Sequence, residues 1–225
     1  MFRRSRLHDG TFLICAQRGV GAQNASSACT WLIAEGVKAL ANLGVSGGLQ
    51  EGLRPGDLVL ADRVIEKGMS GETVAFEPDR ICTDLAHAAF MRKGMSVHRG
   101  AIYSAQQGLL TVEEKKSLRS RSLALVVDME SAAVARAAVE AGLPFFVLRA
   151  VCDPADWSVD QDLFSCLGQD GRVRLLLLLE KIGRRPSLLR GLLRTRRDFL
   201  LALNNLSRAW RIQIRIDMPK RLLSR

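Results

Sequence analysis

The sequence lacks the cysteine and histidine spacings of metal sites, and it has no apolar run long enough to cross a membrane. Its cysteines and histidines are widely scattered, as Cys15, Cys29, Cys82, Cys152, Cys166, His8, His87 and His98. An odd number of cysteines without a CxxC pair is typical of reduced thiols in a cytoplasmic protein, and no metal site is expected. The run Leu175–Leu179 ends at Glu180, well short of the ~18 residues of a membrane span. The stretch Phe12–Ala16 is likewise too short for a signal peptide.

Nucleotide-cofactor motifs are also missing. The glycine-rich segment Gly44–Gly48 does not match GxGxxG, and no Walker lysine follows it, so we expect no dinucleotide or ATP cofactor. Aromatic residues make up only 5% of the chain. The basic C-terminal part carries Trp210 at the end of a helical pattern but no series of aromatic side chains, so a nucleic-acid partner is not expected.

Charge is distributed unevenly along the 225 residues, a length that suits one domain with an appendage. Residues 1–167 carry 18 Lys and Arg against 19 Asp and Glu, a balance of −1. Residues 168–225 carry 15 against 4, a balance of +11. We therefore predict a nearly neutral domain over residues 1–170 and a basic helical extension over 171–225. Such an extension favours an anionic partner, for example a membrane surface.

Apolar runs alternate with helical patterns through the first part of the chain. Strands are predicted at 11–17, 37–45, 58–65, 97–103, 123–129 and 144–152, and helices at 22–35, 79–94, 113–122 and 131–142. Because the strands are continuous apolar runs, we expect an α/β fold whose mostly parallel sheet is covered on both faces. Ligands of such sheets bind at the carboxyl ends of the strands. This rule selects the 18–21 loop, the 45–49 loop, and the acidic residues Asp128, Glu130 and Asp153.

Each of these features allows two interpretations. Asp128-Met129-Glu130 ends a strand and begins a helix, so its carboxylates either cap the helix or accept hydrogen bonds from vicinal hydroxyls. Asp153 either forms an Asp-Pro turn or acts as a general acid whose pKa is raised by an apolar pocket. The Gly47–Gly48 pair either forms a tight turn or lets backbone amides cradle an anion. One helix connects the two acidic strands, so a βαβ unit would place them side by side and bring Glu130 and Asp153 to one rim.

Four segments resemble the purine nucleoside phosphorylase and methylthioadenosine/S-adenosylhomocysteine nucleosidase superfamily in their order and spacing. They are Arg18-Gly-Val-Gly, NLGVSGGLQEGLRPGDLVLAD at 42–62, VVDMESAAVA at 126–135 and LPFFVLRAVCDPAD at 143–156. The CDPAD ending and the basic segment 171–203 most resemble the hopanoid-associated phosphorylase branch. The resemblance covers about residues 11–210, and it implies a three-layer αβα sandwich around a mixed sheet.

The resemblance also implies a reaction, the cleavage of a purine N-ribosidic bond, and roles for individual residues. By resemblance, Glu130 accepts hydrogen bonds from the ribose hydroxyls, Met129 packs under the sugar, and Asp153 helps to protonate the purine at N7. The second reactant, water or phosphate, is expected at Gly47–Gly48 together with Arg18. No cofactor is implied other than phosphate as a co-substrate. A homo-oligomer is expected by analogy with superfamily members.

The sequence departs from the superfamily pattern at two places. Nucleosidases carry a hydroxyl residue two positions before the first Gly of GGL, where this chain has Val45 with Ser46 beside it. Superfamily members also begin with a strand and an acidic loop, whereas only MFRRSRLHDG precedes the segment that resembles their second strand. The first strand and its carboxylate are therefore expected to be absent, and Asp9 is a poor substitute.

Three functional hypotheses follow. The leading one is an enzyme that releases adenine from an adenosine-type nucleoside, with adenosylhopane of hopanoid biosynthesis as the substrate that the branch suggests. The alternative enzyme is a methylthioadenosine/S-adenosylhomocysteine nucleosidase, whose soluble substrates do not require a basic extension. The third hypothesis, motivated by the absent first strand, is a homologue that binds nucleosides without turning them over.

A basic amphipathic helix is predicted over 188–211, because a period of ~100° per residue separates apolar residues from arginines. The apolar side comprises Leu188, Leu192, Phe199, Leu203, Leu206 and Trp210. The opposite side comprises Arg190, Arg194, Arg197, Arg208 and Arg211. Such a helix either lies peripherally on the inner membrane surface, where a lipid-linked nucleoside would be reached, or docks onto the domain with its arginines solvated.

Overall fold

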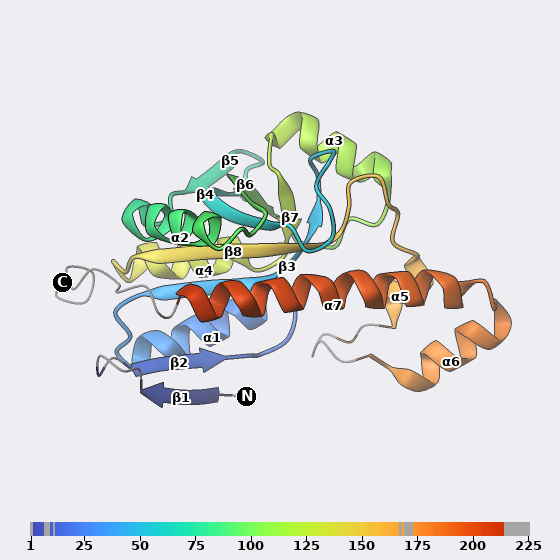
Figure 1. The fold of residues 1–225 in the computed structure, drawn as a ribbon, viewed down its shortest axis with the longest axis horizontal. Helices are drawn as coiled ribbons and strands as arrows, with labels where there is room; N and C mark the ends of the chain where they lie inside the picture. Colours follow the sequence, from blue (N-terminus) through green and yellow to red (C-terminus); the bar gives the residue numbers. More distant parts are fainter. Residues whose placement is uncertain (1, 7–9, 11, 167, 169–172, 214–225) are drawn as a thin grey trace.

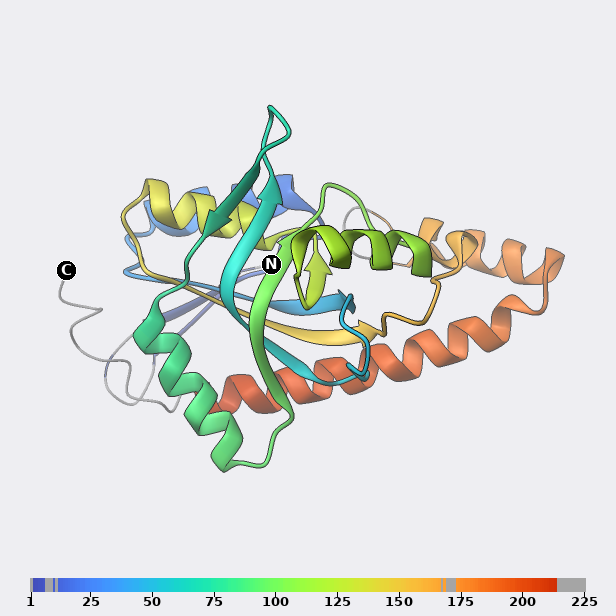
Figure 2. The same cartoon turned by 90° about the horizontal axis from the view of Figure 1, so that it is seen from above.

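The computed structural model describes residues 2–6, 10, 12–166, 168 and 173–213. Its main sheet has six strands in the order β5-β4-β6-β7-β3-β8 (Figure 1). They are β3 (Leu40–Gly48), β4 (Leu58–Lys67), β5 (Thr73–Phe76), β6 (Val97–Ser104), β7 (Val126–Asp128) and β8 (Phe145–Asp153). The ladders β3–β8, β4–β6 and β6–β7 are parallel, and β3–β7 and β4–β5 are antiparallel. β4 also pairs with β8, so the strongly curved sheet closes on itself (Figure 2).

Helices cover both faces of this sheet, which confirms the predicted three-layer αβα sandwich (Figure 1). On one face lie α1 (Ala22–Ala34) and α4 (Ser131–Glu140), which pack against each other. On the other face lie α2 (Arg80–Arg92) and α7 (Leu188–Gln213). α3 (Val112–Ser122) lies between β6 and β7 in the chain, and α5 (Gln161–Ser165) and α6 (Leu175–Arg184) connect β8 to α7.

Strand residues alternate between two cores, which explains why the strands are continuous apolar runs. Val59 and Val147 pack in the core under α1 and α4, whereas Leu58, Leu60 and Leu148 pack in the core under α2 and α7. All five side chains are completely buried. A sheet covered on both faces requires apolar residues at odd and even positions alike, and the sequence satisfies that requirement.

Three predicted strands differ from the structure. β2 (Phe12–Ala16) is not a buried strand, because it pairs with β1 (Phe2–Arg6) in a separate two-stranded antiparallel sheet. β1 carries three arginines, which could not be buried in the main sheet without partners. The strand predicted at 123–129 is shortened to β7, because Leu123 ends α3 in a left-handed conformation with a φ of 57°. The strand predicted at 37–45 runs through Gly48 as β3, so the predicted 45–49 loop is largely strand.

α7 docks on the sheet, and its contact face is rotated from the predicted apolar side. Ala202, Leu206 and Ala209 pack in the core beside β8 and β3. Of the predicted apolar residues, Phe199 and Leu203 are instead 40% and 39% exposed. The small side chains of the two alanines let the helix approach the strands closely, and this contact sets the rotation. The five arginines of the predicted basic side are exposed, as expected. Within the described residues, no helix is both long and apolar enough to span a bilayer.

Candidate active site

Asp128 and Glu130, at the end of β7, contact different parts of the chain. Asp128 is buried and accepts hydrogen bonds from the backbone N–H groups of Glu130 at 3.3 Å and Ser131 at 3.2 Å, where α4 begins. Glu130 makes no side-chain cap of α4. Its Oε1 accepts a hydrogen bond of 2.7 Å from the N–H of Gly21, which precedes α1. The capping interpretation therefore applies to Asp128, and Glu130 reaches the 18–21 segment, as the strand-end rule predicted.

A buried arginine that sequence reasoning missed joins these two carboxylates. Arg149 lies in β8 and is 2% exposed, with its Nε 2.5 Å from Asp128 Oδ2 and its Nη2 3.7 Å from Glu130 Oε2. It also donates to Ser131 Oγ. A Cβ at Gly44 would lie 1.9 Å from Nη1 of Arg149, so this glycine makes room for the guanidinium. A charge inside the apolar run PFFVLRAVC was the signal available in the sequence.

Asp153, at the end of β8, is paired with a second buried cation that the sequence did not reveal. Lys115 of α3 is completely buried, and its Nζ lies 2.6 Å from Asp153 Oδ2. On the other carboxyl oxygen, Cys152 Sγ donates to Asp153 Oδ1 at 3.1 Å. Burial raises the pKa of the Asp153 carboxyl above its ordinary value, although Lys115 and Cys152 oppose this shift. Asp153 is therefore easier to protonate than an exposed aspartate, as a general acid requires.

The two acidic strands both pair with β3, one on each side, and are not adjacent to each other. The predicted βαβ neighbourhood of β7 and β8 is wrong, because β3 inserts between them. Gly47 of β3 pairs with Val127 on one side and with Asp153 on the other, which separates the ends of β7 and β8 by two strand spacings, or about 10 Å. A Cβ at Gly47 would lie 3.1 Å from Asp153 Oδ2, and one at Gly48 would lie 3.2 Å from the backbone N of Ala155. Both glycines thus permit a close strand approach.

The remaining predicted site residues lie at several places in the fold. Arg18 is exposed in the segment that connects β2 to α1 and leads to Gly21. Met129 lines a hollow of about 320 Å³ that Gln23 of α1, Ser104 of β6 and Ala132 of α4 also line. Ser46, beside Gly47, is buried, and its Oγ has no hydrogen-bond partner within the described residues. His8 and Asp9 lie outside the described residues.

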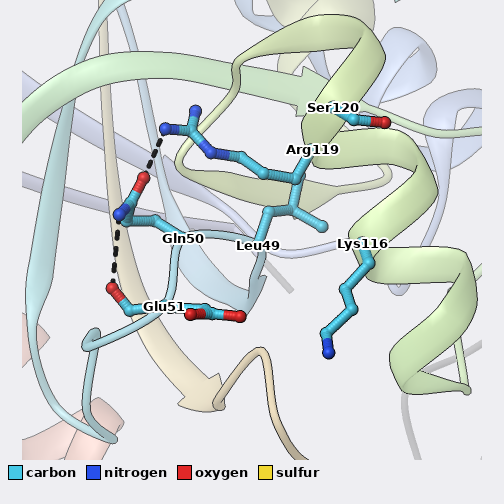
Figure 3. A pocket seen from close by; sticks show the side chains of 6 residues that line it. All are labelled: Leu49, Gln50, Glu51, Lys116, Arg119 and Ser120. Carbon is cyan, nitrogen blue, oxygen red and sulfur yellow. Dashed lines mark hydrogen bonds between the residues drawn. The ribbon is translucent and has the colours of Figure 1, made fainter.

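A second hollow, of about 340 Å³, lies between the exposed side of α3 and residues 49–51 that follow β3 (Figure 3). It is lined by Leu49, Gln50, Glu51, Lys116, Arg119 and Ser120. Arg119 donates to Gln50 and to the backbone oxygen of Leu123, so its guanidinium is already engaged. None of the predicted site residues lines this hollow. The candidate site is therefore taken as two buried charged groups on either side of β3, Asp128, Glu130 and Arg149 in one and Lys115 and Asp153 in the other.

Comparison with known proteins places the chain among nucleoside-cleaving enzymes. A family model described as the phosphorylase superfamily matches residues 2–179. The 5'-methylthioadenosine/S-adenosylhomocysteine nucleosidase of Haemophilus influenzae (strain PittEE) is 27% identical over 190 residues, which are 78% of this chain and 83% of that protein. The corresponding Helicobacter pylori nucleosidase, in complex with a pyrrolopyrimidine-substituted pyrrolidinol, has a TM-score of 0.65 at 27% identity, covering 69% of this chain and 72% of that one. The Neisseria meningitidis nucleosidase has a TM-score of 0.70 at 21% identity, covering 95% and 88%, a likeness of fold.

Proposed function

The chain belongs to the phosphorylase superfamily, and we propose that it cleaves the N-ribosidic bond of an adenosine-type nucleoside and releases adenine. The observation that carries this proposal is that one residue, Gly47 of β3, pairs both with Val127 of β7, three positions before Glu130, and with the buried acid Asp153 of β8. The names of the relatives, which are nucleosidases, support it.

The charges of the site suit the transition state of this reaction. Breaking the bond places positive charge on the ribose and negative charge on the departing purine. Near the proposed sugar position, Asp128 and Glu130 share one guanidinium, that of Arg149, so three charges sum to −1 and favour a cationic sugar. Near the proposed purine position, protonated Asp153 beside the Lys115 ammonium leaves a net charge of +1, which favours an anionic leaving group.

Individual residues then take the roles that the resemblance suggested. Glu130, oriented by the Gly21 N–H, accepts hydrogen bonds from the ribose hydroxyls, and Met129 packs under the sugar. Asp153 donates its proton to N7 of the purine. We propose that the attacking water or phosphate lies near Gly47–Gly48 and Arg18. The unpartnered Oγ of Ser46, next to Gly47, offers a hydrogen bond there.

The relatives favour hydrolysis of methylthioadenosine or S-adenosylhomocysteine over the cleavage of adenosylhopane. Chromatography of adenine released from a panel of methylthioadenosine, S-adenosylhomocysteine, adenosine and a lipid-linked adenosine, with and without phosphate, separates these substrates. We expect adenine from the thionucleosides without phosphate, and at least a ~10²-fold lower rate for Asp153→Asn. Equal rates for the two proteins would remove Asp153 from the chemistry. Adenine binding by calorimetry without turnover of any nucleoside would favour a binding protein.

A lipid-linked substrate is the second candidate, because apolar and basic side chains lie exposed together on α6. Leu175, Leu176 and Leu179 are 68%, 85% and 64% exposed. Arg174 precedes them, and Arg184 ends the helix. A surface of this kind suits peripheral contact with an anionic membrane. We also propose a homo-oligomer, which light scattering of the purified chain tests directly.

A further inference from the structure

Lys115 is more than a buried counter-ion. Building on the proposed function, we propose that Lys115 is a positioning residue that aims the carboxyl of Asp153 at the purine and stabilises it as a carboxylate once its proton has been transferred. The proposal gives a reaction role to α3, a helix outside the sheet whose sequence is mostly charged and polar.

The surroundings of Lys115 are those of a fixed cation. Its side chain is completely buried, and three oxygen atoms accept hydrogen bonds from its ammonium group. Nζ lies 2.6 Å from Asp153 Oδ2, 2.9 Å from the backbone oxygen of Pro154 and 2.9 Å from that of Trp157. Two of these acceptors are backbone atoms of the segment that follows Asp153. Lys115 therefore holds the carboxyl and the chain beyond it in one geometry.

Hydrogen bonds at the N-terminus of α3 fix the direction from which the Lys115 side chain reaches Asp153. Thr111 and Glu114 form a capping box, in which the Thr111 hydroxyl accepts from the Glu114 N–H at 3.2 Å and Glu114 Oε2 accepts from the Thr111 N–H at 3.0 Å. The N–H of Val159 donates to the backbone oxygen of Leu110 at 2.8 Å. These contacts join the first turn of α3 to the segment after β8. Lys115 enters the site from a helix end that is attached to the same segment.

The neighbouring lysine shows that this orientation is specific. Lys115 lies one turn before Leu118, which is also buried, so both occupy the inner face of α3. Lys116 is exposed and lines the hollow on the outer side of the helix (Figure 3). Two consecutive lysines of one helix therefore differ in whether they reach the acid, and Lys116 provides a matched control.

The proton and electron balance is closed by this arrangement. The C1′–N9 bond breaks with its electron pair moving to the purine, and the Asp153 carboxyl proton moves to N7. Asp153 is then a carboxylate beside the ammonium of Lys115, which keeps its own three protons. Water then adds to C1′ of the ribose and releases one proton to solvent, and after adenine leaves, Asp153 takes up one proton from solvent, so the reaction consumes one water and restores the acid. A neutral residue at position 115 would leave the new carboxylate buried without a counter-charge, which raises the barrier.

The test compares Lys115→Met, Lys115→Gln and Lys116→Met with the unchanged chain, each checked by thermal melting. We expect kcat to fall about 10- to 100-fold for Lys115→Met and to stay within about twofold for Lys116→Met. The alkaline limb of the kcat/KM profile should move to higher pH in Lys115→Met, because the cation that lowers the pKa of Asp153 is gone. Lys115→Gln, which keeps an N–H donor but not the charge, should move the limb in the same direction.

A double-mutant cycle with Asp153→Asn completes the test. In that background, Lys115→Met should cost less than about threefold. An equal loss in both backgrounds, or an unmoved pH profile, would overturn the positioning role. Carbon-13 titration of the Asp153 carboxyl gives a readout that does not depend on turnover. If no nucleoside is cleaved, the proposed function fails, while an unshifted carboxyl titration in Lys115→Met would overturn the Lys115 proposal alone.

Discussion

The carboxylate oxygens of Glu130 and Asp128 have different hydrogen-bond and ion-pair partners. Asp128 is bound to Ser131 at the start of α4 and to Arg149, whereas Glu130 accepts from the backbone N–H groups of Gly21 and, at 3.4 Å, Met129, and its side chain keeps 21% of its surface exposed. A carboxylate with this exposure retains acceptor capacity for a ligand. The carboxylate of Asp128, in contrast, is occupied by Arg149 and by the first residues of α4.

A substitution at Glu130 should therefore affect catalysis far more than folding. Glu130→Gln keeps the size of the side chain and an acceptor oxygen but removes the charge that favours a cationic ribose. We expect kcat/KM for adenine release to fall by at least ~10²-fold with little change in melting temperature. The matched change Asp128→Asn should lower the melting temperature clearly, because it leaves the buried Arg149 without its closest partner. Reversed effects at the two positions would contradict this division.

The raised pKa of Asp153 predicts the direction of the pH dependence. The proton donor must be protonated, so kcat/KM should fall as pH rises through the pKa of Asp153. Because burial raises that pKa, the alkaline limb should lie above the ~3.9 of an ordinary aspartate. A pH-rate profile on methylthioadenosine measures it. Asp153→Asn should lose that limb together with most of the rate, and a limb that persists in the variant would assign it to another group.

At the residue scale, the acidic residues of the candidate site could be predicted from the sequence, whereas its buried lysine could not. Glu130 and Asp153 could be predicted because acidic residues at the ends of apolar strands are conspicuous. Lys115 stands in a charged helical pattern that predicts a solvated face, and its partner Asp153 is 38 positions away. Only the packing of α3 against the end of β8 distinguishes Lys115 from Lys116.

At the scale of elements, the spacing of apolar residues predicts that a helix forms better than it predicts which face of that helix packs on the sheet. The 188–211 pattern predicted a helix correctly, but large apolar side chains were expected at the contact. Leu188 and Leu206 are buried as expected, but the rest of the contact is made by Ala202 and Ala209, with Asn205 Nδ2 donating to the backbone oxygen of Gly56 at 2.9 Å. Likewise, β7 and β8 were expected to be neighbours because one helix connects them, whereas long-range pairing with β3 decided their positions.

A matched pair of leucines on α7 tests the observed rotation. Both belong to the predicted apolar side, but Leu206 is 9% exposed and packs in the core, whereas Leu203 is 39% exposed. Leu206→Ala should lower the free energy of unfolding by about 2–4 kcal/mol, and Leu203→Ala by less than about 1 kcal/mol. Denaturant unfolding measures both changes. Equal costs would show that the helix contacts the sheet through the predicted side.

At the scale of the whole molecule, part of the basic C-terminal segment forms an extension beyond the sheet. α6 and the first turns of α7 extend past the sheet in both views (Figures 1 and 2). Lys181 and Arg185 hold this extension to the acidic residues Asp160 and Asp162 next to α5. Arg194 lies over the ring of Trp157, with its Cζ 3.5 Å from the ring centroid. With these contacts made, Leu175, Leu176 and Leu179 of α6 remain exposed, whereas Leu178 is buried.

This geometry predicts reversible binding to anionic vesicles. Each basic residue near an anionic surface contributes about 1 kcal/mol, and the exposed leucines of α6 add apolar burial. The full chain should sediment with phosphatidylserine-containing vesicles at low salt, less so as salt rises, and not with neutral vesicles. Replacing Leu175, Leu176 and Leu179 together by Gln should weaken sedimentation at unchanged charge, whereas Met69→Gln, at a fully exposed residue remote from α6, should not. If the unchanged chain stays in the supernatant at low salt, α6 does not contact lipid, and a lipid-linked nucleoside loses its support as the substrate.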